Sequence, residues 1–327
     1  MRPSFMLLLL ALVLVNSVLV CNGKKLLKMK YYRKTCSSVE SIVRDITWRK
    51  VAENSSFAPK LLRLHYHDCF VRGCDGSILL DSTDDQTKDN EKAAGPSRSL
   101  AGYEVVDEIK AKLEEECPGV VSCADILALA ARDAVSYQFR RRMWKVFTGR
   151  KDGRVSVSSE VTANMPSASS NLTTLLSKFE THGLNMMDLV TLSGAHTIGT
   201  TRCVLLSRRL YNFTGRGDTD PSLDPEYANT LRKICPNPSN PATRVEMDPQ
   251  SSSSFDSHYF RIVNQHKGMF VSDAALLTDQ KSAQMAQLLE NPVVFIARFA
   301  QSMKKMNEII SLEAGEGEVR KNCRVVN

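Results

Sequence analysis

Cysteines constrain this chain more than any other residue type. The 327-residue sequence contains nine, of which Cys21 ends an N-terminal apolar segment. The other eight are Cys36, Cys69, Cys74, Cys117, Cys123, Cys203, Cys235 and Cys323. An even number in an exported chain predicts four disulfides. Eight cysteines allow 105 pairings, so their spacing alone fixes none of them.

The N-terminal segment predicts export. Arg2 precedes an apolar run from Phe5 to Val20, and small residues occupy the −3 and −1 positions of a cleavage site after Gly23. This layout is typical of a secretory signal peptide, which makes residues 1–23 the signal peptide and residues 24–327 one mature domain. A membrane anchor is the alternative, since about 20 apolar residues can span a bilayer. No second apolar segment of that length follows, which favours the signal peptide.

The composition is that of a soluble globular protein. Hydrophobic residues make up 43% and charged residues 24% of the chain, which is enough apolar material to exclude disorder. The formal charge of +7 arises from many charges of both signs. It is too weak to indicate nucleic-acid binding, although it favours loose contact with a polyanion. Sequons at Asn54, Asn171 and Asn212 agree with export.

Apolar residues mostly recur at helical spacing, which predicts a mainly α protein with many helices. Such stripes occur within residues 39–46, 172–179 and 295–306, and we expect each to pack in the core. Ser122 lies three residues before Asp125, as in a capping box at the start of a helix. Strand signals are few, and the segment from Val155 to Val157 is one.

Two segments are dense in reactive side chains. In the first, Leu61 to Ser77, Arg63 and His67 are four residues apart and would share one face of a helix. An alternative for this segment is a zinc site, with His65, His67, Cys69 and Cys74 as ligands. An oxidising compartment instead favours a disulfide between the two cysteines. The second segment, Leu192 to Gly199, is centred on His196.

Oxygen ligands accompany both segments. Asp68, Asp75 and Ser77 flank the loop between Cys69 and Cys74, and the stretch from Asp248 to Asp256 alternates carboxylates with hydroxyls. Calcium prefers such oxygen ligands, so both stretches are candidate calcium sites.

Together these segments resemble those of the secreted plant haem peroxidases, the class III family that includes horseradish peroxidase. The resemblance covers essentially the whole mature chain, and all eight mature cysteines fall at family positions. It includes Tyr31-Tyr32, Val121-Ser-Cys-Ala-Asp125, the segment ending at His196, Arg209-Leu-Tyr-Asn-Phe213 and Asn322-Cys-Arg-Val-Val326. It implies the haem-peroxidase fold, in which distal and proximal helical halves sandwich one haem b (protohaem IX). It also implies a monomer.

The resemblance implies an enzyme that reduces hydrogen peroxide and oxidises small phenolic donors by one-electron steps. His196 matches the proximal ligand of the haem iron, and Asp273 matches the carboxylate that accepts a hydrogen bond from it. His67 matches the distal base and Arg63 the guanidinium beside it. A neutral imidazole can take a proton from peroxide and return it to the leaving oxygen, whose charge a guanidinium stabilises. Pro166 matches a residue of the substrate-access edge.

The resemblance also implies two calcium ions and one pairing of the cysteines. The distal calcium ligands would be the side chains of Asp68, Asp75 and Ser77 and the carbonyls of Val71 and Gly73, with Glu91 linked through water. The proximal ligands would be the side chains of Thr197, Asp248, Ser251 and Asp256 and the carbonyl of Ser254. The implied disulfides are Cys36–Cys117, Cys69–Cys74, Cys123–Cys323 and Cys203–Cys235.

Several positions depart from the family pattern. Ser97 replaces an Asn that accepts a hydrogen bond from the distal histidine, and because serine is shorter we expect slower reaction with peroxide. Tyr66 replaces the usual Phe; we expect it to pack, with hydrogen bonding or oxidation as alternatives. Ala101 replaces an Arg, and Ala168 replaces a proline of the access edge. The basic turn Arg140-Arg-Arg-Met143 is either solvated or contacts an anionic cell-wall polysaccharide.

Three functions stay open at this point. The first is an active secreted peroxidase, and the second is a haem-binding cell-wall protein with weak catalysis because Ser97 and Tyr66 alter the distal pocket. The third is a calcium-dependent polysaccharide-binding protein without haem, against which the four matched haem-site residues argue. No nucleic-acid or membrane partner is expected. The chain stops at Asn327, without the extension often carried by vacuolar members, which favours an extracellular or cell-wall location.

Overall fold

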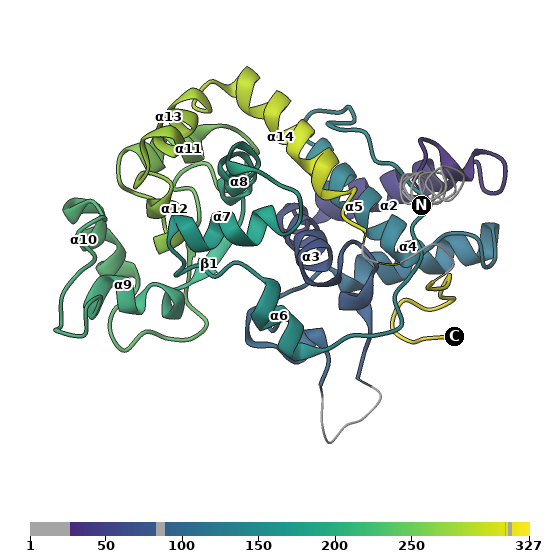
Figure 1. Ribbon diagram of the computed structural model, residues 1–327, viewed down its shortest axis with the longest axis horizontal. Helices are drawn as coiled ribbons and strands as arrows, with labels where there is room; N and C mark the ends of the chain where they lie inside the picture. Colours follow the sequence, from purple (N-terminus) through teal and green to yellow (C-terminus); the bar gives the residue numbers. More distant parts are fainter. Residues whose placement is uncertain (1–26, 83–88, 311, 313–315) are drawn as a thin grey trace, which may run out of the picture.

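Helices dominate the computed structural model, which describes residues 27–82, 89–310, 312 and 316–327 (Figure 1). The expected signal peptide lies outside the described residues. The α-helices are α2 (Val39–Glu53), α3 (Phe57–Arg72), α4 (Tyr103–Glu116), α5 (Cys123–Ser136), α6 (Ser158–Asn164), α7 (Leu172–Glu180), α8 (Met186–Ser193), α9 (Ser207–Tyr211), α10 (Pro225–Ile234), α11 (His258–Asn264), α12 (Val271–Ala275), α13 (Gln280–Leu288) and α14 (Pro292–Met306). The prediction of a mainly α fold is confirmed.

Short elements connect these helices. The 3-10 helices are η1 (Tyr31–Arg33), η2 (Ser77–Leu79), η3 (Glu91–Ala93), η4 (Gly95–Ser97), η5 (Gly194–Thr197) and η6 (Cys203–Leu205). The strands are β1 (Thr200–Arg202) and β2 (Arg244–Glu246). No described helix is both long and apolar enough to cross a membrane.

Side-chain caps explain where several helices begin. The Ser122 hydroxyl accepts a hydrogen bond from the Asp125 amide at the start of α5 (3.3 Å), where the sequence predicts a cap. Asn171 caps α7 in the same way (2.9 Å), and Asn291 caps α14, whose first residue is Pro292. Proline suits this position because its missing amide hydrogen would be unpaired there.

The helices form two groups that share a core. α5 is buried along its whole length and packs against α2, α3 and α4. In the second group α8 packs against α7, α13 and α14, and α11 packs against α13 and η5. One hydrophobic cluster runs through both groups, from Val43 on α2 to Phe295 on α14. Figure 1 shows α2, α4 and α5 on the right and α9 and α10 at the far left.

The strands differ from the prediction. β1 and β2 pair antiparallel, with Thr200 opposite Glu246 and Arg202 opposite Arg244. The segment from Val155 to Val157 is not a strand, so that expectation is wrong. Val155 is 46% exposed, and among the described residues no strand lies beside the segment with which it could form a ladder.

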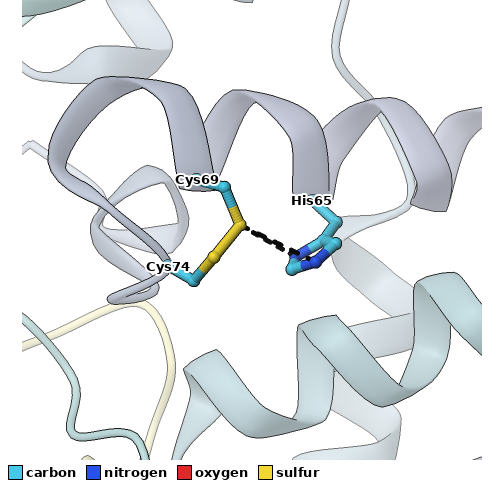
Figure 2. A group of neighbouring side chains, drawn as sticks. All are labelled: His65, Cys69 and Cys74. Carbon is cyan, nitrogen blue, oxygen red and sulfur yellow. Dashed lines mark hydrogen bonds between the residues drawn. A yellow bond between two sulfur atoms is a disulfide. The ribbon is translucent and has the colours of Figure 1, made fainter. Parts of the chain in front are cut away.

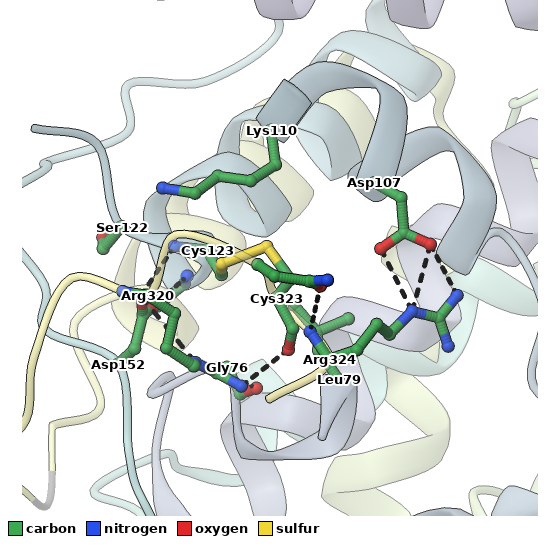
Figure 3. The surroundings of a disulfide bond; sticks show 12 residues. Gly76, Leu79, Asp107, Lys110, Ser122, Cys123, Asp152, Arg320, Cys323 and Arg324 are labelled. Carbon is green, nitrogen blue, oxygen red and sulfur yellow. Dashed lines mark hydrogen bonds and ion pairs between the residues drawn. A yellow bond between two sulfur atoms is a disulfide. The ribbon is translucent and has the colours of Figure 1, made fainter. Parts of the chain in front are cut away.

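All four disulfides implied by the resemblance are present. Their S–S distances lie between 1.96 and 2.08 Å. Cys123–Cys323 joins the start of α5 to the C-terminal segment, which ends beside α4 (Figures 1 and 3). Buried Arg320 fixes this segment by donating to the carbonyls of Cys323 (2.7 Å) and Gly76 (2.6 Å), and Arg324 pairs with Asp107 (2.7 Å).

Candidate active site

The two residues predicted to lie on the distal side come from α3. Arg63 and His67 lie one helical turn apart, so both project from the same face. His67 is 2% exposed, and burial together with the nearby Arg63 cation lowers its pKa well below the usual range. His67 is therefore a neutral imidazole that can accept a proton.

Contacts from the following loop hold the Arg63 guanidinium. Its Nη1 donates to Ser99 Oγ (3.1 Å) and its Nη2 donates to the Pro96 carbonyl (2.9 Å). Although the Arg63 side chain is exposed, its partial desolvation among neighbouring groups lowers its pKa, and the Arg244 cation adds to this. The sequence analysis did not identify Ser99 as a partner of Arg63, because the two residues are far apart along the chain.

Ser97 leaves the distal histidine without its expected partner. Among the described residues, neither His67 Nδ1 nor Ser97 Oγ has a hydrogen-bond partner, although both atoms are buried. An unpaired buried polar atom costs about 1–3 kcal/mol and leaves the ring free to change its tautomer.

Tyr66 packs against aromatic neighbours. Its ring centroid lies 4.6 Å from that of Phe70, which in turn contacts Phe179 (4.9 Å) and His182 (4.8 Å). It meets His67 edge-on at 5.8 Å. Burial raises the pKa of the Tyr66 phenol, which therefore stays protonated at neutral pH.

The proximal histidine is held by a carboxylate. His196 lies on η5, and its Nδ1 is 2.8 Å from Asp273 Oδ1 on α12. The Tyr259 hydroxyl donates to the same oxygen (2.8 Å), and the Phe270 amide donates to Oδ2 (2.8 Å). Burial alone would raise the pKa of Asp273, but the contacts with His196, the Phe270 amide and the Tyr259 hydroxyl lower it.

This arrangement prepares His196 as a ligand. Because Nδ1 is engaged by Asp273, Nε2 is the nitrogen that can bind a metal, and an anionic partner makes the ring more basic. The sequence analysis missed Tyr259. Its position in a buried apolar stretch of α11 gives no sign of a polar role.

The zinc alternative is wrong. Cys69 and Cys74 form a disulfide with S–S 2.05 Å, so neither sulfur is a thiolate (Figure 2). Figure 2 shows the His65 ring facing Cys69 Sγ, which lies 3.6 Å from Nδ1. His65 Nε2 is hydrogen-bonded to Asn307 Oδ1. Burial lowers the pKa of His65 to about 3, which makes it a neutral core residue.

The predicted distal calcium ligands form a buried acidic group. In the described chain, both carboxylate oxygens of Asp68 and Glu91 lack hydrogen-bond partners, as do Asp75 Oδ2 and Ser77 Oγ. Burial raises the pKa of Asp75 to about 6 and that of Glu91 to about 8. It also raises that of Asp68, with help from both neighbours. Unpaired buried carboxylates are costly, so this group fits a divalent cation.

Two backbone carbonyls, those of Val71 and Gly73, are the other predicted ligands of this group. The Val71 carbonyl accepts from Asn164 Nδ2 (2.9 Å), and the Gly73 carbonyl accepts from the Asp75 amide (2.8 Å). Each carbonyl oxygen has a second lone pair, which leaves room for a cation.

The predicted proximal ligands also converge. Thr197 Oγ1 lies 3.0 Å from Asp248 Oδ2, 3.3 Å from Asp256 Oδ1 and 3.4 Å from the Ser254 carbonyl. Ser251 Oγ donates to Asp256 Oδ2 (2.7 Å). Two carboxylates among hydroxyl and carbonyl oxygens make a donor set that suits calcium.

The sequence analysis missed a histidine beside this group. His258 Nδ1 is 2.6 Å from Asp248 Oδ1, on the side of the carboxylate away from Thr197. Burial raises the pKa of Asp248 despite the contacts with His258 and Thr197. A histidine ten residues after an aspartate carries no local pattern that would have shown this pair.

The remaining predicted positions lie outside these groups. Pro166 follows Met165, the C-cap of α6, and the next turn is tied to α12 because the Ala168 carbonyl accepts from the Ser272 amide (3.0 Å). In the basic turn, Arg140 stacks on Tyr137, with its guanidinium carbon 4.1 Å from the ring centroid. Arg142 pairs with Glu40 (2.7 Å). Two of the three arginines therefore have partners within the molecule.

Comparison with known proteins agrees with this geometry. The peroxidase family model matches residues 43–291. Peroxidase 24 of Arabidopsis thaliana is 55% identical over 92% of this chain and 87% of its own length, and Peroxidase 1 of the same plant is 46% identical over 98% of each. Peroxidase 5 of Vitis vinifera is 45% identical over 92% of each chain.

The match extends over far more than half of the chain and includes α3, η5 and α12, which carry the residues described above. The family implies haem as cofactor, hydrogen peroxide as oxidant and a reducing substrate. The expected resemblance is confirmed, and the chain belongs to the plant peroxidase family and is a peroxidase.

Proposed function

We propose that this peroxidase is an exported enzyme that oxidises small phenolic donors, with protohaem bound between His67 and His196. One observation carries the proposal: a neutral, buried His67 and a tethered Arg63 share a face of α3, while Asp273 holds His196 on η5. A proton acceptor, a fixed cation and an oriented metal ligand are the three groups that peroxide reduction needs from the protein.

The residues present fit a haem. His196 Nε2 would bind the iron, since Asp273 occupies the other ring nitrogen. The haem, when bound, supplies the redox chemistry. The side chain of His196 is 36% exposed although its partner Asp273 is 1% exposed, so the ring is accessible to a ligand.

The chain's own residues handle the proton. Neutral His67 takes a proton from hydrogen peroxide and later returns it to the departing oxygen. Arg63 stabilises negative charge on that oxygen, and its contacts with Ser99 and Pro96 hold the guanidinium in place before peroxide arrives.

We also propose that two calcium ions brace the site. The unpaired oxygens of Asp68 support the distal ion, and Asp68 directly follows His67 in α3. The converging oxygens around Thr197 support the proximal ion, and Thr197 directly follows His196 in η5. Each cation would thus fix the backbone next to one histidine.

Substrate access and location complete the proposal. Pro166 would line the edge at which small phenols enter, and Ala168 would leave that edge wider than proline does. The eight paired cysteines support an oxidising, extracellular or cell-wall location, with residues 1–23 removed as a signal peptide. The enzyme would act as a monomer, and exposed Arg141 would make loose contact with anionic polysaccharide.

Reconstitution tests the proposal. Residues 24–327 are expressed with haem and calcium, the Soret band is recorded, and peroxide is added with guaiacol. We expect a Soret band and rapid guaiacol oxidation. Absence of a Soret band in correctly disulfide-bonded protein would contradict it, and His196→Ala should abolish the band without changing the far-ultraviolet circular dichroism.

A second candidate is a haem-binding cell-wall protein with weak catalysis. The unpaired atoms of His67 and Ser97 favour it, because a base in the wrong tautomer cannot accept the proton. A Soret band with little guaiacol oxidation would select this alternative over the first.

A further inference from the structure

Two arginines face each other across the β1–β2 ribbon. Arg202 is the direct cross-strand partner of Arg244. Both are exposed and lie on one face of the ribbon, whereas the neighbouring cross-strand pair, Thr201 and Val245, is buried on the other face. Like charges directly opposite each other destabilise a strand pair, so an anion bound between the two guanidinium groups would stabilise the ribbon.

The described residues supply no such anion. Neither guanidinium forms an ion pair there, and the side-chain hydrogen bond of Arg244 goes to the neutral Thr200 Oγ1 (3.3 Å). Glu246 is the carboxylate on the same ribbon face. Its Oε2 accepts from the Gln250 amide (3.0 Å) and its Oε1 accepts from Ser252 Oγ (2.8 Å), so both oxygens are engaged elsewhere.

The ribbon lies beside the proposed haem site. β1 begins four residues after His196. Gly199, just before it, abuts Pro59 on α3: a Cβ added to Gly199 would lie 2.9 Å from Pro59 Cβ, and its φ is +96°. Arg63 lies one helical turn after Pro59, and the Arg244 cation helps to lower its pKa. The arginine pair therefore lies on a ribbon that follows a direct contact with α3, the helix that carries Arg63.

A second cation stands on the α3 side. Lys60 directly follows Pro59, and its ammonium lies 4.7 Å from the Phe57 ring centroid without an ion pair in the described chain. The edge thus combines a ring face with cations at Lys60, Arg202 and Arg244. An aromatic acid has matching parts, namely a flat ring and a carboxylate. A guanidinium binds carboxylate through two parallel hydrogen bonds.

We propose that Arg202 and Arg244 form a carboxylate site at the edge of the haem site and make the enzyme prefer phenolic donors that carry a carboxylate. This rests on the proposed phenolic donor class and names a subclass within it. A second source of the same chemistry is the carboxylate of protohaem itself, and the experiment has an arm for each source.

The donor arm uses 4-hydroxycinnamate and its uncharged methyl ester. Arg202→Gln, Arg244→Gln and the double variant are compared with Arg216→Gln, which removes the same charge from an exposed loop. We expect the double variant to raise KM for the acid on the order of 5-fold and to leave KM for the ester within about 2-fold. In 0.5 M salt the discrimination of the wild type should shrink.

Equilibrium dialysis of the same two compounds reports binding without turnover. This measurement distinguishes failure of the proposed donor class from failure of the carboxylate site. If neither compound is turned over, the phenolic donor class is contradicted. If the wild type nevertheless binds the acid more tightly than the ester, and the double variant does not, the carboxylate site is still supported.

The cofactor arm compares protohaem with its dimethyl ester by the rate of haem transfer to apomyoglobin. If the arginines hold the haem carboxylate, the double variant loses protohaem several-fold faster and the ester at an unchanged rate. That result supports the carboxylate site with the haem as its source. The proposal is overturned if the double variant matches Arg216→Gln in both arms.

Discussion

At the scale of single residues, the two histidines of this enzyme differ in how well they are oriented. His196 has a buried carboxylate at 2.8 Å, and that carboxylate is itself held by Tyr259 and the Phe270 amide. His67 has no partner at Nδ1 in the described chain. The histidine proposed to bind iron is therefore held firmly, whereas the one proposed to transfer a proton has an unmet requirement, a hydrogen-bond acceptor at Nδ1.

Ser97→Asn should meet that requirement. A longer side chain with a carbonyl oxygen can accept the His67 Nδ1 proton and favour the tautomer whose Nε2 is a base. We expect the rate constant for reaction with peroxide, measured by stopped-flow absorbance, to rise on the order of tenfold. Ser97→Ala is the matched control and should change little, because Ser97 Oγ has no partner. Equal rates for Asn and Ser at this position would contradict the argument.

Tyr259→Phe tests the support behind His196. The change removes one donor from the buried Asp273 carboxylate, which should lower the free energy of unfolding by about 1–3 kcal/mol. Urea titration followed by circular dichroism measures it. Tyr31→Phe, at a tyrosine that is 46% exposed, should stay within about 0.5 kcal/mol of wild type. Similar losses of unfolding free energy in both variants would contradict a role of Tyr259 in supporting His196.

At the scale of elements, α3, the loop that follows it and η3 form one unit around the buried acidic group, to which each contributes a carboxylate. Asp68 comes from α3, Asp75 from the loop after it and Glu91 from η3. Burial raises the pKa values of all three carboxylates, and repulsion from neighbouring carboxylates raises those of Asp68 and Glu91 further. A cation is thus expected to decide how firmly these elements pack.

Calcium removal should consequently loosen this unit. If a site binds calcium at about 1,000 times its Kd, losing it costs about 4 kcal/mol, or on the order of 10 °C in Tm. Differential scanning calorimetry with EGTA and with added calcium measures the shift. Glu91→Gln should reduce the difference in Tm between the calcium and EGTA samples, whereas Asp45→Asn, at an exposed carboxylate, should leave that difference unchanged. An unchanged Tm in EGTA would contradict a bound structural cation.

Element by element, what the sequence could predict depends on how local the cause is. The helical stripes and the Ser122 cap are set by residues three or four positions apart, and both are confirmed. β1 and β2 were missed because each is three residues long and their pairing joins segments more than forty residues apart. The contacts of Tyr259 and His258 were missed because their partners lie 14 and 10 residues away, at spacings that match neither a helical nor a strand repeat. The pairing of cysteines came only from family resemblance.

At the scale of the whole molecule, covalent links tie the ends of the chain to its centre. Cys123–Cys323 spans 200 residues, whereas Cys69–Cys74 spans 5. The conformational entropy that a disulfide removes from the unfolded chain grows with the logarithm of the loop length, so the two bonds stabilise the fold unequally.

Paired serine variants should show this inequality. Replacing Cys123 and Cys323 together should lower the free energy of unfolding by about 5 kcal/mol, and replacing Cys69 and Cys74 together by about 2 kcal/mol. Guanidinium unfolding of the calcium-loaded proteins provides the measurement. Equal losses would show that native packing, such as the Arg320 contacts, outweighs chain entropy at the long bond.

The long bond also has a consequence for the order of events during synthesis. At a synthesis rate of about 5–20 residues per second, Cys123 is added to the chain roughly 10–40 s before Cys323. Throughout that interval Cys123 is a thiol near Cys117, whose own partner, Cys36, has already emerged. Correct pairing therefore requires that Cys36 capture Cys117 first or that a disulfide isomerase correct the error. Cys123, at the start of the buried helix α5, cannot form its native disulfide until Cys323 has been synthesised.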